Sequence, residues 1–361
     1  MPGNKDADLI LVGTRKGAFV FTSKDGRRSW KMHGPYFEGT DVFHMVHDGR
    51  SGTTYAGVSN YQWGPQMMSS RDLGETWKES KKHPKFPKGS GWSVEQLWHI
   101  EPGSERNPER LYAGVAPAGL FVSNDSGDTW KLVSGLTNHP TRKEWTPGAG
   151  GMCLHSILVD PRSPKKLHVG ISAVGVLYSE DGGQKWSFQN KNVRAGFLPN
   201  KYPVFGQCVH KLRRVNGEPD TLIQMNHCGV YRSTDNGVAW KEITENLPSD
   251  FGFSIALDHN VKGRIYAIVE KGGDNRTPPK DHFAVWIKEG SLPWRKVEKG
   301  FPDPAYFGTY REGMASDRED PCGVYFGTNT GLLYASRDMG ESWTRVAEAL
   351  PPILSVTAAR A

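Results

Sequence analysis

An eight-residue pattern, Ser-x-Asp-x-Gly-x-(Thr/Ser)-Trp, recurs along this 361-residue chain and constrains its fold more than any other feature. Three copies are intact, at residues 70–77, 123–130 and 336–343. Two more, at 179–186 and 233–240, each differ at one position. A sixth copy at 23–30 has Arg27 in place of the glycine, and a seventh at 287–294 keeps little beyond its tryptophan. Self-similarity of this kind predicts a repeat architecture.

The spacing of these copies indicates the size of the repeat. The seven tryptophans that end them follow one another at intervals of 47, 53, 56, 54, 54 and 49 residues. They are Trp30, Trp77, Trp130, Trp186, Trp240, Trp294 and Trp343. An interval of this length accommodates four short antiparallel strands, as in one blade of a propeller. The sequence therefore predicts seven such units in a closed ring.

The repeated pattern resembles the Asp-box, or BNR, repeat of the sialidase, xyloglucan-hydrolase and sortilin families, and the resemblance covers essentially the whole chain. It implies an all-β, seven-bladed β-propeller. The residue types suit a hairpin loop in which Asp accepts backbone N–H bonds, Gly takes a positive φ and Trp is buried between blades. In such families the box is structural, so its aspartates are expected to belong to the scaffold.

The two ends of the chain are expected to complete one blade. The segment that begins at Leu9 has the pattern of a second strand, whereas residues 352–357 have the pattern of a first strand. N- and C-terminal strands in one sheet would close the ring and remove its free edge. We therefore expect residues 1–361 to form a single propeller domain.

Composition limits the compartment and the partners. Residues 1–8 are polar, and no apolar run reaches the ~18 residues that a membrane span requires. The cysteines form no CxxC pair, which favours free thiols in a cytoplasmic protein; they are Cys153, Cys208, Cys228 and Cys322. The net charge of +6 is spread over 45 basic and 39 acidic residues, a pattern that predicts no nucleic-acid or membrane partner and weakly favours an anionic ligand. The oligomeric state is left open.

Four histidines occupy one column when consecutive repeats are aligned. Each precedes an equivalent pair of residues in its second strand by 12 or 14 residues; they are His44, His99, His155 and His210. Imidazoles that converge on the propeller axis would suit a transition metal, Fe, Cu or Zn. The arrangement is similar in concept to the four-histidine iron site of carotenoid-cleaving propeller oxygenases. The alternative is that these histidines line a channel or form hydrogen bonds between blades.

The same column later holds Tyr310, Arg311 and Glu312, which we take as candidate catalytic residues. An arginine and a glutamate at the axis could bind a carboxylate and exchange protons, or could simply neutralise each other. Other residues expected near the column are the loop cations Arg15, Lys16 and Lys271 and the lining residues His227, Cys153 and Cys208.

Three functions are compatible with this pattern, because propellers host many activities. The favoured hypothesis is a metal-dependent enzyme that acts on a small organic substrate at the four-histidine site. The second is a glycoside hydrolase, which the Asp-box resemblance implies. Against it, the sequence has no Arg-Ile-Pro motif and only one propeller, whereas xyloglucan hydrolases pair two. The third is a non-catalytic propeller that binds a partner, as photosystem-assembly and sortilin-type relatives do.

Overall fold

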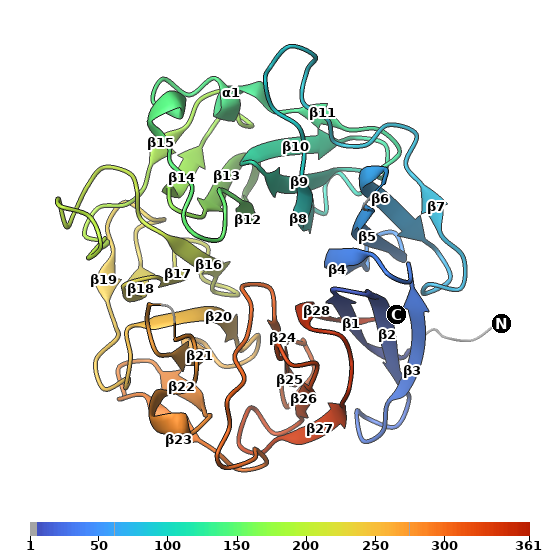
Figure 1. Ribbon diagram of the computed structural model, residues 1–361, viewed down its shortest axis with the longest axis vertical. Coiled ribbons are helices and arrows are strands. Elements are labelled where there is room, and N and C mark those ends of the chain that lie inside the picture. Colours follow the sequence, from blue (N-terminus) through green and yellow to red (C-terminus); the bar gives the residue numbers. More distant parts are fainter. Residues whose placement is uncertain (1–5, 61, 274) are drawn as a thin grey trace.

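The computed structural model describes residues 6–60, 62–273 and 275–361 and contains seven four-stranded antiparallel sheets around a central axis (Figure 1). The predicted all-β, seven-bladed propeller is confirmed. Helical structure in the described residues is limited to α1 (Ser134–Thr137) and two 3-10 turns, Arg142–Glu144 and Pro279–Asp281. No helix among the described residues is long and apolar enough to cross a membrane.

Within a blade the strands follow the order of the chain from the axis to the rim (Figure 1). The second blade contains β4 (Asp41–Asp48), β5 (Thr53–Asn60), β6 (Gly64–Ser70) and β7 (Lys78–Glu79), and the third contains β8 (Gln96–Pro102), β9 (Leu111–Ala116), β10 (Gly119–Ser123) and β11 (Lys131–Leu132). The fourth contains β12 (Leu154–Asp160), β13 (Ser163–Ile171), β14 (Gly175–Ser179) and β15 (Ser187–Phe188), and the fifth contains β16 (Val209–Arg214), β17 (Leu222–Asn226), β18 (Gly229–Ser233) and β19 (Lys241–Glu242). The sixth contains β20 (Phe251–Leu257), β21 (Arg264–Glu270), β22 (Val285–Glu289) and β23 (Arg295–Val297), and the seventh contains β24 (Met314–Ser316), β25 (Val324–Gly327), β26 (Leu333–Ser336) and β27 (Thr344–Ala347).

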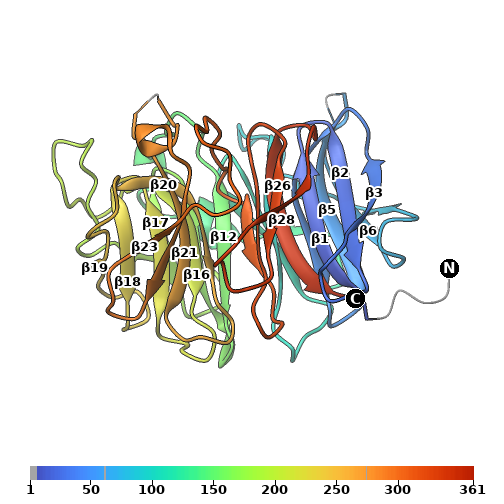
Figure 2. The same cartoon turned by 90° about the horizontal axis from the view of Figure 1, so that it is seen from below.

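The first blade joins the two ends of the chain. Its strands are β28 (Ile353–Arg360), β1 (Asp8–Thr14), β2 (Gly17–Ser23) and β3 (Lys31–Tyr36). Strand β28 lies innermost and pairs antiparallel with β1, with Asp8 opposite Arg360 and Val12 opposite Val356. Figure 2 shows the C-terminus beside β1. The predicted closure by both terminal strands is confirmed.

The loop of each repeated motif is held by a local hydrogen-bond network. In the loop at 70–77, Ser70 Oγ donates to Asp72 Oδ1 at 2.7 Å and accepts from Gly74 N at 2.8 Å. Asp72 Oδ1 also accepts from Thr76 N at 2.8 Å. Equivalent bonds recur in the loops that begin at Ser23, Ser123, Ser179, Ser233 and Ser336. The loop aspartates are thus engaged in turn geometry.

The glycine of the motif also couples neighbouring blades. Gly127 in the third blade has a φ of +84°, and a ring carbon of Tyr55 in the second blade lies 3.1 Å from where a Cβ would stand. Both the left-handed backbone and the aromatic neighbour require a residue without a side chain. Where Arg27 replaces this glycine, its guanidinium donates to the buried Asp317 of the seventh blade at 2.9 Å.

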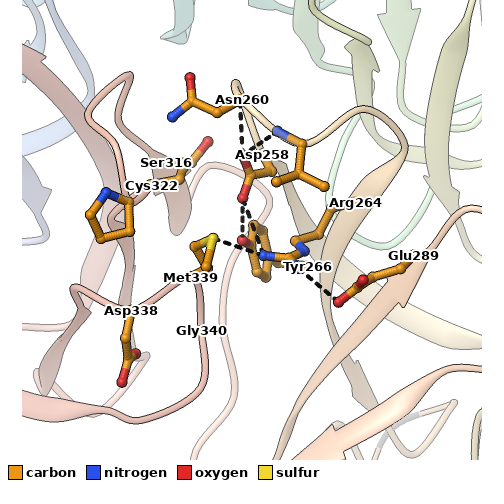
Figure 3. Close-up of polar contacts among 12 residues, drawn as sticks. Asp258, Asn260, Arg264, Tyr266, Glu289, Ser316, Cys322, Asp338, Met339 and Gly340 are labelled. Atoms are coloured by element: carbon orange, nitrogen blue, oxygen red, sulfur yellow. Dashed lines mark hydrogen bonds and ion pairs between the residues drawn. The ribbon is translucent and has the colours of Figure 1, made fainter.

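The turns that follow the innermost strands form a second repeated network. After β20, Asp258 Oδ1 accepts from the backbone N–H groups of Asn260 and Val261 at 2.8 Å each. Its Oδ2 accepts from the hydroxyl of Tyr266 at 2.7 Å, and Arg264 lies between Asp258 and Glu289 (Figure 3). Related carboxylates in other blades are Asp48, Asp160 and Asp317. These aspartates also belong to the scaffold.

Candidate functional site

A β-bulge interrupts the pairing between innermost and second strands at the level of the histidine column. In the second blade the pairing jumps from Val42 to His44, which lies opposite Gly57, so Phe43 is left out. In the third blade it jumps from Leu97 to His99, opposite Gly114, and Trp98 is left out. In these two blades the histidine is therefore the paired residue.

In the fourth and fifth blades the bulge lies at the same level of the second strand, but the histidine comes one residue earlier and is itself the bulge residue. Their pairing jumps from Leu154 to Ser156 and from Val209 to Lys211, which leaves His155 and His210 unpaired. A slip of one residue turns a side chain to the opposite face of a strand. The position that His44 and His99 occupy in their blades is therefore occupied by Ser156 in the fourth blade and by Lys211 in the fifth.

Hydrogen bonds between blades agree with this register. The backbone N–H of Ile100 donates to His44 Nδ1 at 3.2 Å, and the backbone N–H of Leu212 donates to Ser156 Oγ at 3.1 Å. The predicted column of four equivalent histidines is thus wrong. Counting residues back from the second strand did not allow for turns of different length: eight residues separate the paired Pro102 and Leu111, whereas seven separate the paired Arg214 and Leu222.

The four histidines accordingly divide into different environments. His155 has both ring nitrogens engaged, Nε2 with Val209 O at 2.9 Å and Nδ1 with Ser156 Oγ at 3.1 Å. Burial, followed by the charge of Arg311, holds the pKa of His155 well below its ordinary value. His210 bonds to Gly252 O at 2.6 Å through Nδ1. Only His44 and His99 lie side by side, with ring centroids 4.4 Å apart.

His44 and His99 meet Glu312 and Lys211 near the propeller axis. His99 Nδ1 lies 3.3 Å from Glu312 Oε1, and His44 Nε2 lies 3.7 Å from Glu312 Oε2. The ammonium of Lys211 forms an ion pair with Glu312 Oε2. All four side chains are at most 5% exposed, so two histidines, one lysine and one glutamate share a nearly dry site.

The charges of this cluster follow from burial and from the ion pair. Burial by itself would raise the pKa of Glu312, but Lys211 and then His99 and His44 lower it, and the net result is well below its ordinary value. Burial lowers the pKa of Lys211 to about 8, although Glu312 opposes this effect. Burial and then His99 hold the pKa of His44 well below its ordinary value. At neutral pH the cluster contains a carboxylate, an ammonium and a neutral His44.

A metal ion does not fit this cluster as it stands. The ligand atoms of His44, His99 and Glu312 lie within 4.8 Å of one another, and two histidines with one carboxylate are a known donor set for iron. However, Lys211 Nζ already bonds to the only carboxylate of that set. Its ammonium takes the place of a cation and would repel one.

A cavity of about 330 Å³ adjoins the cluster. Its polar lining includes His44, His99, Glu101, Lys211, Arg213 and His259. It extends past Leu257, Ser316 and Ala358 toward the ends of the innermost strands. The cavity therefore lies on the side of the cluster toward which the innermost strands run.

Two buried atoms beside the cavity lack hydrogen-bond partners. His99 Nδ1 and Glu312 Oε1 are 3.3 Å apart, but their angles do not form a hydrogen bond, and both atoms stay unsatisfied. On the other side of the ring, His99 Nε2 bonds to Glu101 Oε2 at 3.2 Å. The carboxylate of Glu101 is one-third exposed. Two acids thus flank one imidazole, and His99 Nδ1 and Glu312 Oε1 remain without a partner beside the cavity.

The structure places the predicted catalytic residues Tyr310, Arg311 and Glu312 in three different environments. Glu312 belongs to the axial cluster, whereas Arg311 donates to Ser172 Oγ at 3.1 Å and lies over the ring of Phe253 at 5.1 Å. Tyr310 is half-buried, and its carbonyl accepts from Gly313 N at 2.9 Å. The predicted loop cations lie at the surface or are paired there: Lys16 is exposed, Arg15 contacts Asp41 and Lys271 contacts Asp281.

Sequence reasoning missed Lys211 and Glu101. Lys211 directly follows a residue of the predicted column, so the turn after β16, which is one residue shorter than the turn after β8, would have been the signal for it. Glu101 follows His99 by two residues on the same strand, and side chains two residues apart share a face of a strand.

A second cluster joins three residues that the sequence analysis mentioned separately. The ligand atoms of Cys208, His210 and His227 lie within 4.8 Å of one another. Cys208 and His210 are buried and His227 is half-buried. All four cysteines of the chain are free and buried.

Comparisons with known proteins give relatives for part of the chain, while no family model matches it. It is 33% identical over 79 residues to an oligoxyloglucan-reducing end-specific xyloglucanase of Emericella nidulans, covering 22% of this chain and 9% of that protein. It is 25% identical over 276 residues to a xyloglucanase of Paenibacillus sp, covering 67% of this chain and 26% of that protein. The matched part thus spans about a quarter or less of the length of these relatives.

Solved structures with the same fold include an ancestral GH74 enzyme, with a TM-score of 0.59, 16% identity and coverage of 88% of this chain and 38% of that chain. Another is YCF48 bound to a D1 peptide, with a TM-score of 0.53, 14% identity and coverage of 84% and 80%. At these identities the likeness shows the fold alone. The chain is therefore a seven-bladed β-propeller. The repeats led us to expect a resemblance to sialidases, xyloglucan hydrolases or sortilins, and the two curated relatives reported above are xyloglucanases.

Proposed function

We propose that this chain is a glycoside hydrolase that acts on a small xyloglucan-type oligosaccharide. The observation that carries the proposal is the 25% identity to a xyloglucanase over 276 residues. A match of this length extends over several blades, whereas one repeated motif would account for only a short alignment. This favours the second of the three functions over the metal-dependent enzyme.

The axial cavity is the proposed sugar site. Its volume of about 330 Å³ lies at the lower end of the range for small-molecule pockets. Sugar hydroxyls both donate and accept hydrogen bonds. Neighbouring hydroxyls of a sugar could each donate a hydrogen bond to one of the two unpartnered atoms, His99 Nδ1 and Glu312 Oε1. The basic side chains of Lys211 and Arg213 add donors to the same wall.

Glu312 and Glu101 are the proposed acid pair, because cleavage of a glycosidic bond generally uses two carboxyl groups. Lys211 keeps Glu312 ionised, which suits a carboxylate that activates water or stabilises positive charge on the sugar. Glu101 is partly exposed on the cavity wall, where it could protonate the leaving oxygen. His99 lies between the two acids and holds their relative positions.

The test is release of reducing sugar from xyloglucan oligosaccharides and from aryl β-glucosides. We expect hydrolysis by the parent protein and a loss of about 100-fold or more in kcat for Glu101→Gln and Glu312→Gln. Glu109→Gln is the control, because Glu109 is exposed on the turn that follows β8. A combined Glu312→Gln and Lys211→Met variant avoids an unpaired buried ammonium and should be equally inactive.

Equal rates for the parent and the acid variants would refute the assigned pair, and no hydrolysis of any of these substrates would refute the proposed activity. Saturable oligosaccharide binding without hydrolysis would instead support the non-catalytic propeller. A cytoplasmic location and a single domain over residues 1–361 stay predictions of the sequence.

A further inference from the structure

We infer that Cys208, His210 and His227 form a binding site for a thiophilic divalent metal, Zn²⁺, with a fourth coordination position left open. One sulfur and two imidazole nitrogens are a common donor set for zinc, and three protein ligands leave room for water or an exogenous ligand. The site is separate from the axial cluster, and the inference does not depend on the proposed hydrolase activity.

The β16–β17 hairpin brings the three ligands together. The backbone N–H of His227 donates to Cys208 O at 2.9 Å, so these two residues lie across the hairpin from each other. His210 is the unpaired bulge residue two positions after Cys208. A bulge redirects a side chain that would otherwise follow the regular alternation of the strand, and bulges are frequent beside functional sites.

The separations are close to those of a bound ion. The three ligand atoms lie within 4.8 Å of one another. A tetrahedral zinc with ordinary bond lengths requires ligand atoms about 3.3–3.6 Å apart. The ligand atoms are therefore at most about 1.5 Å farther apart than in a bound site.

Surrounding groups fix the orientation of His210. Its Nδ1 donates to Gly252 O at 2.6 Å, which leaves Nε2 as the nitrogen that can bind a metal. Phe253 stacks on the ring at 4.6 Å and Phe251 meets its edge at 5.3 Å. Histidine ligands usually donate their second nitrogen to a carbonyl or carboxylate in this way, which sets the tautomer and the ring direction.

The open side of the cluster suits a small anion. Ser172 Oγ lies 3.5 Å from Cys208 Sγ and accepts from Arg311 at 3.1 Å. A zinc ion with one thiolate and two neutral imidazoles retains a net charge of about +1, so hydroxide or a carboxylate would complete it. Arg311 adds positive potential beside that position. His227 is only half-buried, and the exposed ring of Phe197 lies 5.0 Å from its ring, so this side of the cluster is near the solvent.

The fourth blade provides an internal comparison. Cys153 and His155 have the same spacing as Cys208 and His210, and Ser172 N donates to Cys153 O at 3.0 Å as His227 N does to Cys208 O. Blade four thus has serine where blade five has the second histidine. The two metal-type clusters found among the described residues do not include one at this place in blade four.

The test uses untagged full-length protein, stripped with a chelator and titrated with Co²⁺ and then Zn²⁺. We expect one equivalent of Co²⁺ to bind with a thiolate-to-cobalt charge-transfer band in the near ultraviolet, and Zn²⁺ to displace it. His227→Ser copies the arrangement of blade four and should weaken binding by on the order of 100-fold. Cys208→Ser should remove the band. Cys153→Ser and Cys228→Ser are the matched controls and should behave as the parent.

Denaturant unfolding of each variant shows whether it is folded, and His227→Ser is suited to this because the residue is only half-buried. Binding of less than one equivalent, or of one equivalent without the thiolate band, would overturn the assignment. So would a His227→Ser variant that binds Co²⁺ as tightly as the parent.

Discussion

Glu270, at the end of β21, gives the sharpest test of the electrostatics inside this propeller. Its side chain is 2% exposed, and its Oε1 accepts from the backbone N–H of Thr309 at 2.9 Å. Burial raises the pKa of Glu270 from 4.5 to about 7, although the Thr309 N–H and the charge of Arg276 act in the opposite direction. The folded protein therefore holds a proton on Glu270 more tightly than the unfolded chain does.

The sign of the pH dependence follows from this difference. Below pH 4.5 the carboxyl is protonated in both states, so its contribution to stability is fully present. Between pH 4.5 and about 7 the folded state binds more protons than the unfolded state, and the free energy of unfolding falls as pH rises. A pKa difference from 4.5 to about 7, at 1.36 kcal/mol per unit, corresponds to about 3 kcal/mol.

The variant Glu270→Gln remains neutral at every pH and keeps a carbonyl oxygen for the Thr309 N–H. We expect the parent and the variant to have similar free energies of unfolding at pH 4.5, and the variant to be more stable by up to about 3 kcal/mol at pH 8. Urea unfolding at a series of pH values measures this difference. Comparing the two proteins cancels the titration of the buried histidines, which they share.

Glu245→Gln is the control, because Glu245 is exposed and its substitution should change stability equally at all pH values. A difference between Glu270→Gln and the parent that stays constant from pH 4.5 to pH 8 would refute the reasoning.

Two further predictions concern the contacts between blades. Gly127→Ala should lower stability by about 1–3 kcal/mol in denaturant unfolding, because a Cβ would be strained at a φ of +84° and would press on Tyr55; an unchanged midpoint would contradict this. Arg27→Ala should lower stability by about 3–5 kcal/mol, since it removes the cationic partner of the buried Asp317 carboxylate. Arg28→Ala, at the exposed neighbouring position, is its control, and an equal effect of both changes would count against the ion pair.

The blade count and the closure of the ring could be read from the sequence because their causes are local. The bonds among Ser70, Asp72 and Gly74 close within five residues, so the same short pattern produces the same loop wherever it occurs. The spacing between copies then sets the number of blades. Strand patterns at the two ends of the chain were enough to predict the pairing of β28 with β1.

The site was predictable only in part. His44, His99 and Glu312 were among the candidates, and the structure brings them together. Which side chain of each innermost strand reaches the axis depends on how that strand pairs with the second strand, and a turn one residue shorter than that of the third blade puts Lys211, rather than His210, beside Glu312. The residues at which each turn begins and ends are set by the pairing of its two strands, which a count along the chain does not contain.

The cluster of Cys208, His210 and His227 was likewise predictable only in part. The sequence supplied Cys208 and His210 on one strand, but His227 joins them only because the β16–β17 hairpin folds it back opposite Cys208. Local hydrogen bonding and residue spacing thus determined the architecture from the sequence alone. The chemistry at the axis was decided by tertiary structure, because a single-residue shift in register changes which face a side chain occupies, and hence which groups meet.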